Sequence, residues 1–242
     1  MMCPKCGFKQ PDVQEQCQRC GVIFAKVHGV PEQQSEPALV GQKHARFGEL
    51  LKKVLTNIPR EKNPVVQSGR MLVWLGLVVW GVKFMFTPVS GEAFSESYMH
   101  LVNLPFHEAG HILFSPFGPF VQVLGGTLGQ LLIPLIVTVS FAIKGNLFAV
   151  SVGFWWLGQS FMDCAPYIDD ARAGQLMLLG GVTGSEVEDY HDWENILSRL
   201  GMMQYDHLVA RIFFGRGVLI VMTALVWGGY VLCRQRLKYC AT

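Results

Sequence analysis

The pentapeptide His107-Glu108-Ala109-Gly110-His111 is the part of this chain whose residue types and spacing could do chemistry. Residues four apart lie on one face of a helix, so His107 and His111 can offer imidazole nitrogens to one metal ion while Glu108 projects beside them. Zinc held in this way lowers the pKa of a bound water to about 7, and a neighbouring carboxylate can take up its proton. The spacing therefore predicts a catalytic zinc site in which Glu108 is the general base.

The surroundings of the pentapeptide favour this interpretation. Half of the 242 residues are apolar and only 16% are charged, which is a composition typical of membrane proteins. Ionisable side chains within apolar segments are costly and usually mark a functional site, so we expect the zinc site to lie at membrane depth. The alternative is a structural or degenerate motif on a helix that only packs.

A second metal site is predicted near the N-terminus, where two Cys-x-x-Cys pairs are each followed by a glycine. Pairs of this form present four thiolates to one zinc ion in a zinc ribbon. Two disulfides would need an oxidising compartment, whereas the absence of a signal peptide and the basic residues that follow predict a reducing cytoplasm. The segment is too short to fold around a core of its own, so zinc binding should supply its folding energy. The four ligands are Cys3, Cys6, Cys17 and Cys20.

The rest of the chain predicts an all-α polytopic membrane protein with about four spans, in addition to the small N-terminal zinc-ribbon domain. We expect the ribbon at 1–29, a linker at 30–70, a membrane-embedded domain at 71–233 and a basic tail at 234–242. The linker contains an amphipathic stretch at 44–58 that either lies on the membrane surface or packs on the protein. The segments long enough to span are 71–88, 121–143, 146–164 and 212–233.

The helix that carries the histidines is predicted to be shorter than a span. Pro105 suits a helix start and Pro116 lies just beyond the expected end. The helix between them would be roughly 16 Å long, about half of a hydrocarbon core.

The charge distribution predicts the orientation. Residues 1–70 hold eleven basic and six acidic side chains, whereas residues 163–206 hold two basic and nine acidic ones. Four crossings would place the N-terminal region and the basic tail together in the cytoplasm, in agreement with the positive-inside tendency. We expect an integral protein of the bacterial inner membrane with a cytoplasmic N-terminus.

A catalytic zinc site normally has three protein ligands, so a third must come from elsewhere in the chain. Acidic residues gather at the end of 146–164, in Asp163-Cys164-Ala165-Pro166-Tyr167-Ile168-Asp169-Asp170, and Gly125-x-x-x-Gly129 lies between this element and the histidines. In these motifs the chain resembles the site-2-protease class of intramembrane zinc metallopeptidases. That class pairs a His-Glu-x-x-His helix with a later Asn-x-x-Pro…Leu-Asp-Gly element, often with a Gly-x-x-x-small motif between them. The resemblance covers roughly residues 100–172.

The resemblance implies roles for the later residues. Asp170, or failing it Asp169, would be the third ligand, and Asp163 stands where the family has its asparagine. Because this chain lacks Leu-Asp-Gly and its spacing is shorter, Asp163 and His191 remain alternative ligands. Gly125 and Gly129 would lie near the peptide being cut, although close helix packing is the more frequent use of such spacing.

The predicted function is that of a zinc-dependent metalloendopeptidase. It would hydrolyse peptide bonds in or near transmembrane segments of other membrane proteins, using one structural and one catalytic zinc ion. The expected partners are the substrate, the lipid bilayer and a cytoplasmic protein that the ribbon binds. Residues 1–29 hold only four basic side chains against two acidic ones, which argues against nucleic acid. The alternative is a non-catalytic membrane adaptor or scaffold that binds a partner through its ribbon.

Overall fold

The structure is a computed structural model that forms two compact units, Met1–Thr56 and Asn57–Thr242. It describes residues 1–3, 5–11, 15–24, 58, 61, 63–90, 93–187 and 190–240, the last four of them by their backbone alone. The last residues of the predicted linker, 64–70, belong instead to the first helix of the second unit, α2 (Pro64–Phe86). The rest of the linker, with the predicted amphipathic stretch at 44–58, lies outside the described residues except for residues 61 and 63 and Ile58. This side chain is buried in a cluster with Phe148, Val231 and Leu232 of the second unit.

The first unit contains two similar tight turns, one for each cysteine pair. An isolated antiparallel bridge closes each turn, between Met2 and Lys9 in one and between Gln16 and Ile23 in the other. Each pair is followed by a glycine in the left-handed region, where a side chain would be strained. These are Gly7 at φ 68° and Gly21 at φ 69°.

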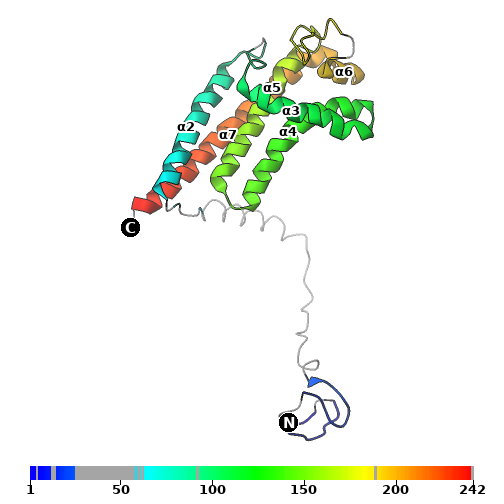
Figure 1. The fold of residues 1–242 in the computed structure, drawn as a ribbon, viewed down its shortest axis with the longest axis vertical. Coiled ribbons are helices and arrows are strands. Elements are labelled where there is room, and N and C mark those ends of the chain that lie inside the picture. The colour runs from blue at the N-terminus through cyan, green and yellow to red at the C-terminus, as the bar shows by residue number, and fades with distance from the viewer. Residues whose placement is uncertain are drawn as a thin grey trace. The chain divides into compact units, whose positions relative to one another are not determined.

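The second unit is helical, and its described residues contain no β-strand beyond one isolated bridge. The prediction of an all-α fold is therefore confirmed. Figure 1 shows the long helices side by side, with α3 and α6 at one end of them. The helices are α2 (Pro64–Phe86), α3 (Tyr98–Phe114), α4 (Pro119–Ile143), α5 (Leu147–Asp169), α6 (Asp192–Arg199) and α7 (Asp206–Cys240), with short 3₁₀ turns η2 (Ser115–Phe117) and η3 (Met203–Tyr205).

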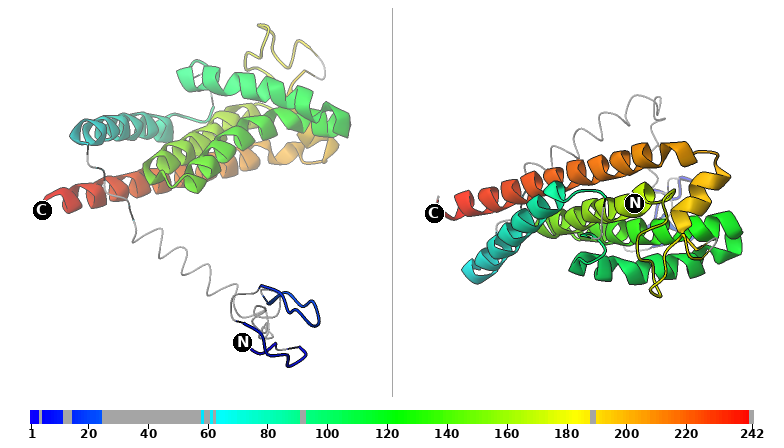
Figure 2. Two further views of the ribbon diagram at one scale, coloured as in Figure 1. Left: turned by 60° about the horizontal axis from the view of Figure 1, so that its bottom comes forward. Right: turned by 90° about the horizontal axis from the view of Figure 1, so that it is seen from above.

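Three stretches within the described residues are long and apolar enough to cross a membrane. They are α2, α4 and Met203–Arg236, which contains most of α7. One of the four predicted spans, 146–164, corresponds to α5, which is not among these three stretches. Helix α5 carries polar residues and packs against α2, α4 and α7, with α7 running along it (Figure 2).

The histidine helix differs from its prediction. Helix α3 begins at Tyr98 and has 17 residues, which makes it about 25 Å long. The side chain of Ser97 caps it by accepting a hydrogen bond from the amide of His100. Pro105 lies inside the helix, where a proline removes one backbone hydrogen bond, and the helix continues through it.

Helices α3 and α4 touch through glycines. A Cβ atom on Gly125 would lie 2.7 Å from the carbonyl oxygen of Gly110, and one on Gly129 would overlap the carbonyl oxygen of Phe106. No side chain fits at these positions while the two backbones stay this close. In this structure Gly125 and Gly129 therefore serve helix packing.

We predict that Gly129→Ala lowers the free energy of unfolding by about 1–3 kcal/mol, because the added methyl group must push α3 away from α4. Gly76→Ala on α2 is the matched control, since no atom lies within 4 Å of the added carbon. Thermal unfolding of both variants in detergent micelles measures the difference. Equal stability of the two variants would show that the contact between α3 and α4 is looser than in this structure.

Candidate metal centre

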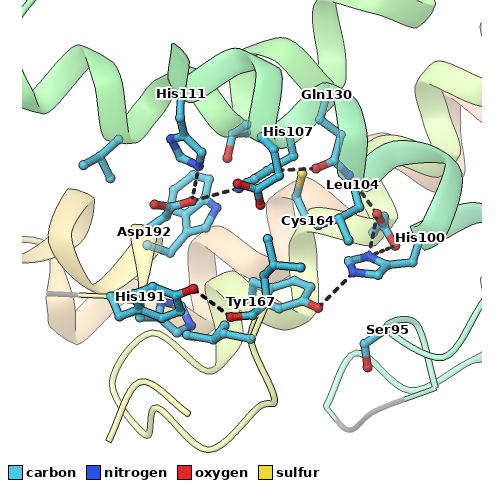
Figure 3. A pocket seen from close by; sticks show the side chains of 18 of the residues that line it. Ser95, His100, Leu104, His107, His111, Gln130, Cys164, Tyr167, His191 and Asp192 are labelled. Atoms are coloured by element: carbon cyan, nitrogen blue, oxygen red, sulfur yellow. Dashed lines mark hydrogen bonds and ion pairs between the residues drawn. The ribbon is translucent and has the colours of Figure 1, made fainter. Parts of the chain in front are cut away.

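His107 and His111 converge on one carboxylate, that of Asp192 (Figure 3). The Oδ2 atom of Asp192 lies 2.8 Å from Nε2 of His107 and 3.1 Å from Nε2 of His111. The two rings meet edge to face, with their centroids 4.8 Å apart. All three side chains are partly buried, so they form a compact polar group between α3 and α6.

Helix α6 delivers Asp192, which is its first residue. The preceding residue, His191, caps the helix because its Nδ1 atom accepts a hydrogen bond from the amide of Glu194. The side chain of His191 is buried, and burial lowers its pKa. Below the cap, Trp193 and Ile196 bury the apolar face of α6 in a cluster with residues of α5 and α7. The position of Asp192 is thus fixed by a short helix that is capped by His191 and packed against α5 and α7.

Helix α4 holds the far side of both imidazoles. Nδ1 of His107 lies 3.3 Å from Oε1 of Gln130, and Nδ1 of His111 lies 2.9 Å from the carbonyl oxygen of Gln122. Both acceptors can only receive a hydrogen bond, so each Nδ1 atom carries a proton. Each Nε2 atom then faces Asp192.

This arrangement requires positive charge between the rings and the carboxylate. A neutral imidazole has one N–H group, yet both nitrogens of each ring face oxygen atoms. A second proton on the rings, or one metal ion between the Nε2 atoms and Asp192, would supply this charge. Two imidazole nitrogens and one carboxylate oxygen are a ligand set of catalytic zinc sites, with a fourth position left open. The residues present therefore fit a zinc ion.

The carboxylate of Asp192 is suited to this role. Burial by itself would raise its pKa, but the hydrogen bonds and the charges of His107 and His111 lower the pKa below its ordinary value. Asp192 is consequently ionised at neutral pH, as a metal ligand must be.

A glycine keeps the space at the imidazoles open. A Cβ atom on Gly126 would lie 2.5 Å from Nε2 of both His107 and His111. Any side chain at this position would occupy the place where a ligand of the two nitrogens must sit. Gly126 therefore contributes to the site through its missing side chain.

The group opens into a cavity of about 800 Å³. Glu108 and Tyr167 line this cavity, as do Met177 to Gly180 and Tyr190 from the loop between α5 and α6. Glu108 forms no hydrogen bond or ion pair with the residues that the structure describes, so its carboxylate is available to a ligand. The cavity thus places an unengaged carboxylate beside the candidate metal centre.

The structure does not bring the carboxylates proposed from the sequence to the histidine pair. Asp170 accepts hydrogen bonds from the amides of Gln175 and Leu176, and Asp169 pairs with His207. Asp163 is buried away from the pair and accepts from Asn103 and Gln130. The carboxylate that lies at the histidine pair is that of Asp192 and not that of Asp170, because helix α5 ends at Asp169 and Asp170 bonds to the backbone of the loop that follows.

His191, the remaining alternative, precedes Asp192 in the chain, but its ring does not face the histidine pair. Its Nδ1 atom caps α6, and its Nε2 atom lies 3.8 Å from the carboxylate of Asp170. Asp192, Gly126 and Gln130 were not predicted from the sequence as residues of the site. The local sequence does not distinguish Asp192 from the other acidic residues of the segment 163–206.

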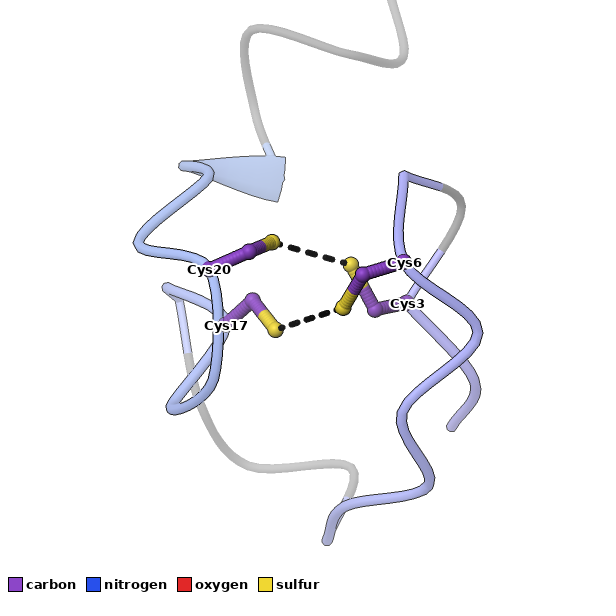
Figure 4. Close-up of side chains that lie close together, drawn as sticks. All are labelled: Cys3, Cys6, Cys17 and Cys20. Atoms are coloured by element: carbon purple, nitrogen blue, oxygen red, sulfur yellow. Dashed lines mark hydrogen bonds between the residues drawn. The ribbon is translucent and has the colours of Figure 1, made fainter.

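The four cysteines of the first unit form a separate group (Figure 4). The Sγ atoms of Cys3 and Cys20 are 3.7 Å apart, as are those of Cys6 and Cys17. All four Sγ atoms lie within 4.8 Å of one another, so the group could hold a metal ion. Burial raises the pKa of Cys17, but hydrogen bonds from the backbone at Cys20 and Arg19 and from the neighbouring thiols lower it to about 6. A thiolate at this position favours metal binding.

Comparisons with protein-family models, with curated proteins and with solved structures gave no match for this chain. The function is therefore inferred from the geometry of the two side-chain groups.

We predict that wild-type protein binds two zinc ions per chain and that Asp192→Asn binds one. Loss of a ligand should weaken the histidine site by more than the roughly 10–100-fold that loss of an outer-shell partner costs. Asp170→Asn is the matched control and should keep both ions, because Asp170 bonds to the backbone of its own loop. Elemental analysis of the purified proteins measures the difference, and the reverse pattern would restore Asp170 as the ligand.

A second prediction concerns Gly126→Ala, in which the added methyl group occupies the space at both Nε2 atoms. Zinc affinity of the histidine site should fall by at least roughly 10–100-fold, while the cysteine site stays filled. Gly215→Ala on α7 adds the same group where no atom lies within 4 Å and should change neither site. Chelator competition measures both affinities. If Gly126→Ala still binds zinc tightly at the histidines, the ion does not occupy the space beside residue 126.

Proposed function

We propose that this protein is an intramembrane zinc metallopeptidase. The observation that carries the proposal is the convergence of His107, His111 and Asp192 in a cavity that also holds the unengaged carboxylate of Glu108. This combination supports peptide hydrolysis, which needs three ligands, an open position and a base. The resemblance to the site-2-protease class agrees with it in the His-Glu-x-x-His helix.

The roles of the residues follow from their placement. A bound zinc ion would polarise the carbonyl group to be cleaved and lower the pKa of a water molecule. Glu108 accepts a proton from that water at its carboxylate and later gives the proton to the amine that leaves. His107, His111 and Asp192 would hold the ion through Nε2, Nε2 and Oδ2, while Gly126 leaves room beside them.

The apolar surface of α3 supports a substrate within the membrane. Leu101, Val102, Ile112 and Leu113 are exposed on the same helix that carries the two histidines. Apolar side chains on such a face suit contact with lipid or with another transmembrane segment. The peptide bond to be cut would therefore lie in or near a transmembrane segment of another membrane protein.

The cysteine group is proposed to bind a structural zinc ion in a zinc ribbon. Its two tight turns, with glycines at positive φ, support four thiolate ligands around one ion. The ribbon would bind a cytoplasmic protein partner or control access to the peptidase. A bacterial inner membrane with the ribbon in the cytoplasm is the location that fits the charge distribution.

We predict that Glu108→Gln keeps both zinc ions and loses peptidase activity by roughly 10²–10⁴-fold, because the amide cannot accept a proton. New N-termini of membrane proteins, profiled by mass spectrometry in cells that produce either form, measure the activity. Glu96→Gln is the matched control, since Glu96 lines the same cavity and lies outside the histidine motif. It should retain the cleavage products.

Two outcomes would overturn the proposal in different ways. Cleavage products that persist in Glu108→Gln cells would remove Glu108 from the role of base. The non-catalytic adaptor would be favoured by two results together: cells that produce wild-type protein show no cleavage products, and the purified protein binds zinc only at its cysteines.

A further inference from the structure

A chain of hydrogen bonds leads from His107 into the interior, across α4 to α5. Oε1 of Gln130 accepts from Nδ1 of His107, and Nε2 of Gln130 donates to Oδ2 of Asp163 at 2.8 Å. Asp163 is 1% exposed, and Gln130 is also buried. The chain therefore connects a candidate metal ligand to a buried carboxylate on another helix.

The amide of Asn103, whose orientation is fixed, donates a hydrogen bond to the carboxylate of Asp163. Nδ2 of Asn103 donates to Oδ2 at 3.0 Å, and Nδ1 of His100 lies 3.2 Å from the same oxygen. The orientation of Asn103 is itself fixed, because its Oδ1 atom accepts from the indole N–H of Trp156, a group that can only donate. On the outer side, the hydroxyl of Tyr167 reaches Nε2 of His100 (Figure 3).

The direction of the chain follows from these roles. Because Asp163 accepts, Gln130 must turn its amide nitrogen toward Asp163 and its oxygen toward His107. The oxygen can only accept a hydrogen bond, so the proton of a neutral His107 sits on Nδ1. The lone pair of Nε2 is then free for a metal ion. Without Asp163, Gln130 could turn either its amide oxygen or its amide nitrogen toward the ring of His107.

We propose that Asp163 and Gln130 are positioning residues that fix the tautomer of His107. The proposal rests on the metal site proposed above and names two residues through which that site is supported. His111 needs no such positioning residue, because its Nδ1 atom faces the backbone carbonyl oxygen of Gln122, which can only accept a hydrogen bond. The outer-shell partner of a metal-bound histidine typically contributes 10–100-fold to metal affinity.

The test replaces Gln130 by methionine, which has a similar length and no strong hydrogen-bonding group. In full-length protein in detergent micelles, Gln130→Met should lower the zinc affinity of the histidine site by roughly 10–100-fold. The nitrogen-15 shifts of the His107 ring should show a single Nδ1–H tautomer in wild-type protein and a mixture in the variant. Asp163→Asn, which offers Gln130 both a donor and an acceptor, should also give a mixture.

Gln159→Met is the matched control. Gln159 is another buried glutamine; it accepts from Asn103 and forms no bond with His107 or Gln130. This variant should keep wild-type zinc affinity and the single tautomer. Equal zinc loss in Gln130→Met and Gln159→Met, or an unchanged tautomer in both Gln130→Met and Asp163→Asn, would overturn the inference.

The outcomes separate this inference from the proposed function. Cobalt titration distinguishes the two metal sites, because thiolate ligands give intense charge-transfer absorption and histidine and carboxylate ligands do not. Wild-type protein that binds cobalt only at its cysteines would refute the metal site itself. Tight binding at the histidine site in both wild type and Gln130→Met would refute only the positioning role.

Discussion

The close contact between α3 and α4 is the constraint on which the rest of the site depends. Because Gly110, Gly125 and Gly129 have no side chains, the two backbones meet. The same face of α4 then presents three features at steps of four residues: the carbonyl of Gln122, the bare backbone of Gly126 and the amide of Gln130. One helix pair thus sets the orientation of both imidazoles and the space beside them. A wider separation would lose all three together.

The third candidate ligand joins this pair from a distant part of the chain. Asp192 lies 85 residues after His107, at the start of a helix with only eight residues. So short a helix is marginal by itself and depends on its packing against α5 and α7. Assembly of the candidate metal centre is therefore coupled to packing of α6 against these helices. Asp170 and His191 contribute to the same loop, since one caps its beginning and the other caps α6.

The sequence predicts those parts of the site that depend on local geometry. His107 and His111 are one helical turn apart, and each cysteine pair closes within a single tight turn, so neither prediction requires knowledge of the fold. The third ligand could not be found in this way, because several acidic residues lie in the segment 163–206 and only packing selects Asp192. The start of α3 was missed for a different reason: Pro105 is compatible with a helix start and with a helix interior, and the cap at Ser97 decides between them.

Helix α5 is long enough to cross a membrane, but its polar residues keep it out of the set of candidate spans. It contains Gln159 and Asp163, and 14 of its 23 residues are buried by the surrounding helices. The faces of α2, α4 and α7 that remain exposed carry apolar side chains, as expected for contact with lipid. A helix enclosed by others needs no apolar surface, so it can hold a carboxylate whose cost is offset by three hydrogen-bonding partners. The polar residues that weaken α5 as a predicted span are thus the ones that connect it to His107.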